Sequence, residues 1–167
     1  AAEDAFLAAG YGTHRREIMY NDFVFIGPKA DPAAVAEAPT ANDVLVRIAA
    51  TEAPFVSRGD DSGTHTKEQT LWKTTGLDLE VQKSTIFNKG KKRAVSYIYP
   101  KGSDKWYLSI GQGMGKTITF ADEKRAYTLA DRGTYIKYKY GRDVSLDLEI
   151  MCEGDTILYN PYGVIPV

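Results

Sequence analysis

The stretch Pro54-Phe55-Val56-Ser57-Arg58-Gly59-Asp60-Asp61-Ser62-Gly63-Thr64-His65 joins a short apolar run to a cluster of helix-capping residues. Residues 55–57 have the composition of a buried strand. Residues 60–64 are of the types that occupy helix N-caps and first turns, and the following helix is expected to end before Gly76. A strand that leads directly into a helix is the repeating unit of layered α/β domains, which is the fold class that this stretch predicts.

The flanking sequence alternates further strand and helix patterns. On the N-terminal side we expect a helix at residues 3–9, a long strand at 17–26 with a break near 21–22, and a helix that begins after Thr40 and ends at Pro54. On the C-terminal side we expect a hairpin (81–87 and 94–99), strands at 106–110, 146–151 and 162–167, a helix at 117–124 and a helical turn after Tyr135. Together these elements predict a mixed β-sheet flanked by helices.

The composition is that of a globular protein and excludes several classes of function. Of the 167 residues, 43% are apolar and 26% are charged, and no apolar run approaches the length that crosses a bilayer. The 21 basic and 22 acidic residues give a net charge of -1, so no global field attracts nucleic acid. The single cysteine, Cys152, excludes an internal disulfide, and His14 and His65 have no third ligand at zinc spacing.

Polar groups converge where the strand at 55–57 meets the following helix. A helix N-terminus carries about half a positive elementary charge and several unpaired donors, so an oxyanion binds there readily. Gly59 and Gly63 permit close backbone approach, and Arg58 offers a planar fork to two oxygens. The alternative is that these residues only cap the helix, with Arg58 paired to Asp60 or Asp61.

A second glycine-rich turn, Gly111-Gln112-Gly113-Met114-Gly115-Lys116-Thr117, also joins a strand to a helix. A phosphate-binding loop requires glycine where this sequence has Ile110, so a small phosphotransfer enzyme is disfavoured. The turn is either a second anion-facing helix start or a tight connection. His65 follows Ser62 too closely to serve as its base, and no Gly-x-Ser-x-Gly elbow is present.

Two other basic features have structural interpretations that we favour. Arg132 is either a second cationic ligand or is held by Asp131 in a packing role, and packing is favoured. The lysines of the hairpin either contact nucleic acid together with Tyr97 and Tyr99, or form a solvated edge that resists aggregation. The solvated edge is the favoured interpretation.

Five segments occur in an order that resembles one family. They are Tyr20-Asn21-Asp22-Phe23-Val24, residues 54–65, Trp106-Tyr107-Leu108 with Gly111-Gln112-Gly113-Met114-Gly115, Tyr127-Thr128-Leu129-Ala130-Asp131-Arg132-Gly133-Thr134-Tyr135 and Asn160-Pro161-Tyr162-Gly163-Val164-Ile165. This order resembles the periplasmic tungstate-binding proteins of ABC transporters, which have the type II periplasmic-binding-protein fold. The resemblance covers the chain except for about residues 79–104.

The resemblance implies a non-enzymatic protein that binds tungstate, and secondarily molybdate, and delivers it to a membrane permease from a periplasmic or extracytoplasmic location. It implies no cofactor and no nucleic acid. The matching arginine is Arg58 and the matching helix-start hydroxyl is that of Thr64. The weaker candidates are Ser57, Ser62, Gly63, Gly113, Met114 and Gly115.

The resemblance also sets the expected domain organisation. Residues 1–16 correspond to the end of a first-lobe helix, 17–161 to the second lobe with an inserted hairpin at about 79–104, and 162–167 to a returning hinge strand. No signal peptide is evident, because the opening residues lack basic and hydrophobic segments. Without a first lobe, self-association into a homo-oligomer is expected. The alternative function is an effector-sensing regulatory domain of the same two-lobed architecture.

Overall fold

A central sheet holds the strands in an order that brings three helix N-termini to one edge. The computed structural model describes residues 2–88, 90–141 and 146–167. The sheet order is β5 (Tyr107–Ser109), β2 (Phe55–Ser57), β6 (Tyr127–Asp131), β1 (Arg16–Pro28) and β7 (Leu148–Cys152). Strands β5, β2 and β6 are parallel, whereas β1 runs antiparallel to β6 and β7. The mixed sheet predicted from the sequence is therefore confirmed.

Each of the three parallel strands leads into a helix. Strand β2 precedes α3 (Gly63–Thr74), β5 precedes α4 (Met114–Lys124) and β6 precedes α5 (Arg132–Tyr140). Because the strands are parallel, these three helices begin at the same edge of the sheet, which is the edge where ligands bind in open α/β sheets.

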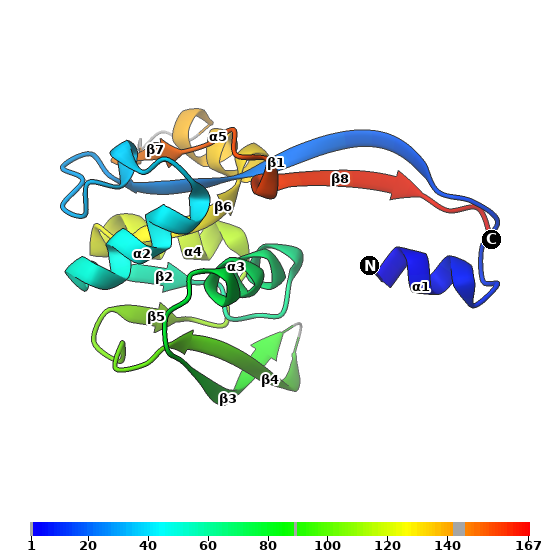
Figure 1. The fold of residues 1–167 in the computed structure, drawn as a ribbon, viewed down its shortest axis with the longest axis horizontal. Coiled ribbons are helices and arrows are strands. Elements are labelled where there is room, and N and C mark those ends of the chain that lie inside the picture. The colour runs from blue at the N-terminus through cyan, green and yellow to red at the C-terminus, as the bar shows by residue number, and fades with distance from the viewer. Residues whose placement is uncertain (1, 89, 142–145) are drawn as a thin grey trace.

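Helices cover both faces of the sheet (Figure 1). Helices α2 (Ala41–Thr51) and α3 pack on one face together with the hairpin of β3 (Leu79–Asn88) and β4 (Lys91–Pro100). Helices α4 and α5 pack on the other face. On the first face Phe55 meets Trp72 edge to face, with ring centroids 5.7 Å apart. No helix in the described part of the chain is long and apolar enough to cross a membrane.

Strand β1 leaves the sheet and continues as an arm (Figure 1). Its first half pairs only with β8 (Tyr159–Val164), and this two-stranded ribbon carries α1 (Ala2–Ala8) at its far end. The strand that pairs with β1 changes from β8 to β6 between Asp22, which is opposite Tyr159, and Phe23, which is opposite Asp131. The break expected near 21–22 is wrong, because the strand is continuous there and only its partners change.

Several other boundaries differ from the sequence-based expectation, among them the start of β7 at Leu148 instead of 146. Strand β6 was not expected, and α5 begins at Arg132 instead of after Tyr135. Helix α4 begins at Met114 instead of 117, because Gly113 acts as its N-cap. Strand β8 spans Tyr159–Val164 instead of 162–167, because pairing with β1 extends to Asp22. Two short 3-10 helices, Val35–Glu37 and Thr156–Leu158, complete the described elements.

Candidate functional site

The N-terminus of α3 presents backbone donors at the sheet edge. Ser62 is the N-cap, and its hydroxyl accepts a hydrogen bond from the His65 amide at 3.4 Å. The Ser62 amide donates in turn to Asp60 Oδ1 at 3.3 Å. Within the described residues, the amides of Gly63 and Thr64 have no hydrogen-bond partner. The capping interpretation is therefore correct for Ser62, while two donors of the first turn stay available.

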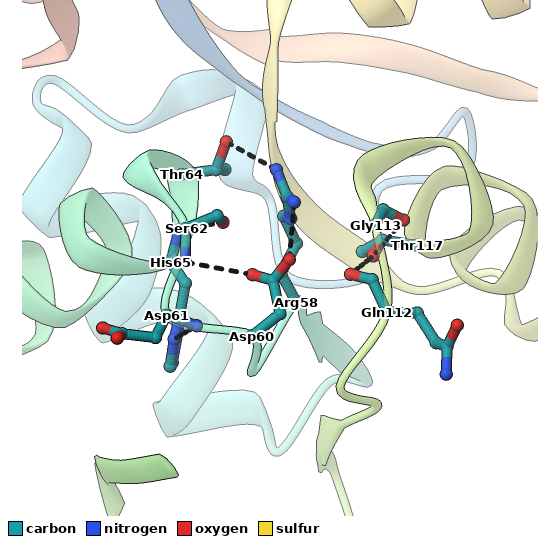
Figure 2. A network of polar contacts seen from close by, with 9 residues as sticks. All are labelled: Arg58, Asp60, Asp61, Ser62, Thr64, His65, Gln112, Gly113 and Thr117. Carbon is teal, nitrogen blue, oxygen red and sulfur yellow. Dashed lines mark hydrogen bonds and ion pairs between the residues drawn. The ribbon is translucent and has the colours of Figure 1, made fainter. Parts of the chain in front are cut away.

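The Arg58 side chain lies between the beginnings of α3 and α4 (Figure 2). Its Nη2 donates to Asp60 Oδ2 at 2.6 Å, and its Nη1 makes a long contact of 3.4 Å with Thr64 Oγ1. Its Nε is buried and has no partner among the residues that the structure describes. A buried donor without an acceptor is costly, so this guanidinium retains capacity for an incoming oxygen.

The backbone next to Arg58 requires glycine. Gly59 has φ +59°, and an added Cβ would collide with the Ser109 hydroxyl at the end of β5. The Arg58 carbonyl accepts a hydrogen bond from the Gln112 amide at 3.1 Å. These two contacts hold the loop after β2 against the loop after β5, which brings the two helix N-termini to the same place.

The second helix start completes the site from the other side. Gly113, the N-cap of α4, provides no side-chain cap, and the amides of Met114 and Gly115 are without partners in the described part of the chain. An open cavity of about 620 Å³ lies here. Its lining residues are Arg58, Asp60, Phe87, Gly111, Gln112, Gly113, Met114, Gly115, Lys116 and Tyr138. Amides, a helix dipole and a guanidinium facing one cavity are suited to binding an anion.

The sequence-predicted site residues fall into two groups. Arg58, Gly113, Met114 and Gly115 line the cavity. The others are not among the lining residues and lie at the end of β2 or the start of α3, namely Thr64, Ser57, Ser62 and Gly63. Thr64 among them contacts Arg58. Of these, Ser57 is fully buried at the end of β2, and its hydroxyl has no hydrogen-bond partner among the described residues.

Arg132 lies apart from this cluster. Its Nε and Nη2 donate to the two carboxylate oxygens of Asp22 at 2.7 and 2.6 Å, and its Nη1 pairs with Glu153 at 2.6 Å. The predicted partner, Asp131, is wrong, because Asp131 instead caps α5 by accepting from the Thr134 amide. The packing role itself agrees with the structure, since Arg132 ties the base of the β1–β8 ribbon to the sheet.

His65 supports the loop and does not face the cavity (Figure 2). Its Nδ1 accepts a hydrogen bond from the Asp61 amide at 2.9 Å, so the neutral ring carries its proton on Nε2. Burial lowers the pKa of His65, which favours that neutral form. Its ring lies 6.0 Å from that of Tyr97 in the hairpin. Among the described residues, no group of three His, Cys, Asp or Glu side chains is arranged to hold a metal ion.

Sequence reasoning missed a buried acid beneath the site. Glu68 is 2% exposed, and its Oε1 accepts hydrogen bonds from the Tyr107 hydroxyl at 2.7 Å and from Trp72 Nε1 at 3.2 Å. Burial raises the pKa of this carboxyl to about 7. The helical spacing could have indicated this burial, because Glu68 follows Thr64 by four residues and shares a helix face with Leu71 and Trp72.

Comparisons with known proteins agree with the expected resemblance. The tungstate-binding protein TupA of Peptoclostridium acidaminophilum is 43% identical over 170 residues, covering 100% of this chain and 50% of the relative. A putative ABC transporter anion-binding protein of Haloferax volcanii is 43% identical over 171 residues, covering 99% of this chain and 42% of the relative. The chain thus spans about half the length of these curated relatives.

A solved structure shows the same arrangement of elements. The tungstate-binding protein TupA from Desulfovibrio alaskensis G20 is 46% identical to this chain, with a TM-score of 0.80. The match covers 99% of this chain and 58% of that one, so the matched span includes the hairpin. A family model described as the PBP superfamily domain matches residues 1–167, and the chain therefore belongs to the PBP superfamily.

Proposed function

We propose that this chain binds a tetrahedral oxyanion, tungstate by preference and molybdate second, as part of a substrate-binding protein of an ABC transporter. The observation that carries the proposal is the position of Arg58 between the N-termini of α3 and α4, with its buried Nε unpartnered among the described residues. Two helix dipoles directed at one guanidinium create a local positive site in a chain whose net charge is only -1.

Arg58 and Thr64 are the principal ligand residues in this proposal. Arg58 supplies charge-assisted hydrogen bonds, and the Thr64 hydroxyl, which accepts the long contact from Nη1, supplies its own proton as a further donor. Ser57, Ser62 and Gly63 contribute from the α3 side. The turn at Gly113, Met114 and Gly115 contributes amides from the α4 side. Asp60 stays paired with Nη2 and fixes the orientation of the guanidinium.

The names of the relatives support the biological setting. Two curated relatives are tungstate-binding proteins and a third is a putative ABC transporter anion-binding protein. We therefore place the chain outside the cytoplasm, with a small oxyanion as its substrate, a membrane permease as its partner and no catalytic step. An effector-sensing regulator of the same architecture is the less favoured alternative, because these relatives are named for anion binding and transport.

Calorimetric titration of the gene product that carries residues 1–167 tests the proposal. Tungstate and molybdate should release heat of binding, whereas sulfate and ATP with magnesium should give weak or no heat. Arg58→Ala should weaken tungstate binding by at least about tenfold, because a hydrogen bond to a charged group contributes about 1.5–3 kcal/mol. Arg47→Ala is the matched control, because Arg47 lies on α2 and donates to the Ala34 carbonyl.

Two results would contradict the proposal in different ways. If the unmodified protein shows no heat with either oxyanion, oxyanion binding is wrong. If Arg58→Ala binds tungstate as tightly as Arg47→Ala does, the function stands and the assigned site is wrong. ATP binding that requires magnesium would favour the phosphotransfer alternative instead.

A further inference from the structure

The hairpin supplies one wall of the cavity, and the proposed function assigns no role to it. Phe87, near the end of β3, lines the cavity together with Arg58 and the turn at Gly113. Among the described lining residues it is the one that comes from the hairpin. Its side chain is 63% exposed, whereas that of Ile86 before it is 7% exposed. A large apolar ring therefore lies in contact with water beside a guanidinium and the start of α4.

The residue before Phe87 fixes the end of β3 to the loop that precedes α4. Gly111 of that loop has φ +63°, and a Cβ added to it would lie 2.7 Å from Ile86 Cγ2. Only glycine leaves room there for the buried isoleucine. Gly111 itself lines the cavity, so β3 packs directly against backbone that belongs to the proposed site.

A second set of contacts fixes the hairpin to the loop that precedes α3. Arg93, which is opposite Ile86 in the hairpin register, forms its ion pair with Asp61 of that loop. The ring of Tyr97 lies 6.0 Å from that of His65, in the first turn of α3. The hairpin thus contacts both loops that supply the proposed ligand donors, and the end of β3 is held at two points.

An apolar wall has a predictable effect on which dianion a site prefers. The hydration free energy of an ion becomes weaker as its radius grows, so sulfate is more strongly hydrated than the larger dianions molybdate and tungstate. An apolar ring removes water from a bound anion and offers no hydrogen bond in return. The cost of this lost hydration is greater for sulfate, so the wall favours the larger oxyanions.

We propose, on the basis of the proposed function, that Phe87 is a specificity-determining residue whose ring favours tungstate and molybdate over sulfate. Arg58 and the helix amides supply an attraction that any tetrahedral dianion receives. Phe87 supplies the discrimination, because its ring takes the place of water that sulfate holds more strongly. Tungstate and molybdate are close in size, so this wall does not separate them from each other.

Competition calorimetry measures this discrimination. Tungstate is titrated into the protein with and without excess sulfate, and the factor by which sulfate weakens tungstate binding gives the affinity for sulfate. Phe87→Ala should lower the ratio of tungstate to sulfate affinity by about tenfold, since apolar contacts in a binding pocket discriminate between ligands by at least that factor. The ratio of tungstate to molybdate affinity should stay unchanged.

Two variants control for the loss of an exposed apolar side chain. Val81 is 68% exposed, lies on the same face of β3 as Phe87 and is absent from the residues that line the cavity. Val81→Ala should therefore keep the full tungstate to sulfate ratio. Phe87→Leu keeps an apolar side chain at the cavity, so it should retain most of the discrimination that Phe87→Ala loses. Thermal unfolding of each variant shows whether its fold is intact.

NMR gives a readout that requires no variant. The ring resonances of Phe87 should shift when tungstate is added, because the bound anion replaces water beside the ring. The methyl resonances of Val81 should stay in place. If the Phe87 resonances do not move when the protein is saturated with tungstate, the ring does not meet the ligand and the inference is wrong.

The outcomes separate this inference from the proposed function. If no form binds tungstate, the proposed function fails. If the unmodified protein binds tungstate and Phe87→Ala keeps the full ratio, the function stands and Phe87 does not determine specificity. If Phe87→Ala weakens tungstate and sulfate binding equally, Phe87 contributes affinity alone, which also overturns the inference. An equal loss of the ratio in Val81→Ala would show that the effect does not come from the cavity wall.

Discussion

Arg93 of the hairpin forms an ion pair with Asp61 at 2.5 Å, which ties strand β4 to the loop that precedes α3. Both side chains are about half exposed, at 54% and 52%, so the pair contributes little to global stability. The contact instead restrains a loop whose neighbours, Arg58 and Thr64, form the proposed site. His65 and Tyr97 make a second contact between the same two segments.

Arg93→Ala should therefore affect the loop more than the fold. We expect a loss of at most about 1 kcal/mol in the free energy of unfolding, measured with urea. Hydrogen exchange of the Asp61 and Ser62 amides, which donate to His65 and Asp60, should become faster, and tungstate affinity should fall severalfold. Lys92→Ala is the matched control, because Lys92 is an exposed neighbour with no ion pair among the described residues. Equal exchange rates in both variants would refute the restraint.

The two glycines at either end of the loop should respond differently to alanine. Gly59→Ala forces a side chain into a left-handed conformation and against Ser109, so we expect a loss of stability of at least about 1 kcal/mol. Gly63→Ala adds a methyl group in open space at the first position of α3, so stability should be unchanged or slightly higher. Its tungstate affinity should nevertheless fall if Gly63 faces the ligand. Thermal unfolding and calorimetry on both variants check these expectations.

Removal of Arg132 should destabilise the protein by about 2–3 kcal/mol, because three charge-assisted hydrogen bonds are lost where the ribbon joins the sheet. The Arg132 guanidinium lowers the pKa of Asp22, so the pair stabilises the fold above the unfolded pKa of about 4. This stabilisation is lost as the pH falls through the lower, folded-state pKa. Urea unfolding at several acidic pH values should show a smaller acid dependence in Arg132→Ala and in Asp22→Asn than in the unmodified protein.

Two buried tyrosines provide a comparison of hydrogen-bond losses away from the cavity. The Tyr127 hydroxyl donates to Asp31 at 2.7 Å and accepts from the Ala33 amide at 3.0 Å. Tyr127→Phe leaves that buried amide without its acceptor and should cost about 1–3 kcal/mol. Tyr135→Phe should cost less, because the Leu148 carbonyl that it leaves still accepts from Lys139 at 3.0 Å. Chemical denaturation should rank the variants in this order, with tungstate affinity unchanged in both.

Local chemistry made much of the fold predictable. Thr40 and Ser62 are residues whose side chains cap a helix wherever they precede one, and both act as N-caps in the structure. The hairpin was visible because two alternating runs flank a short polar turn. Strand β6 was not visible, because Tyr127-Thr128-Leu129 is short and its strand pairing comes from β1 and β2, which are distant in sequence.

The sequence predicted which loops form the candidate site, but not the contacts within it. Glycines, hydroxyls and Arg58 in two strand-to-helix turns indicated anion binding. The pairing of Arg58 with Asp60 was one of the alternatives that the sequence offered, and the structure shows it. The pairing of Asp61 with Arg93 was not predictable, because the two residues are 32 positions apart. The buried hydrogen bond from Tyr107 to Glu68 was not predictable either, because the two residues are 39 positions apart in sequence. Such contacts follow from the sheet order and leave no local pattern.

The β1–β8 ribbon also gives the molecule a direction of mechanical weakness. Arg16 lies opposite Val164 at the end of the ribbon away from Asp22, so a force that pulls these two residues apart acts first on that pair. When an antiparallel strand pair is pulled from one end, its hydrogen-bonded residue pairs separate one after another instead of sharing the force. The ribbon should therefore peel at low force as far as Asp22, where the attachment to Arg132 begins, while the sheet that carries the cavity stays folded.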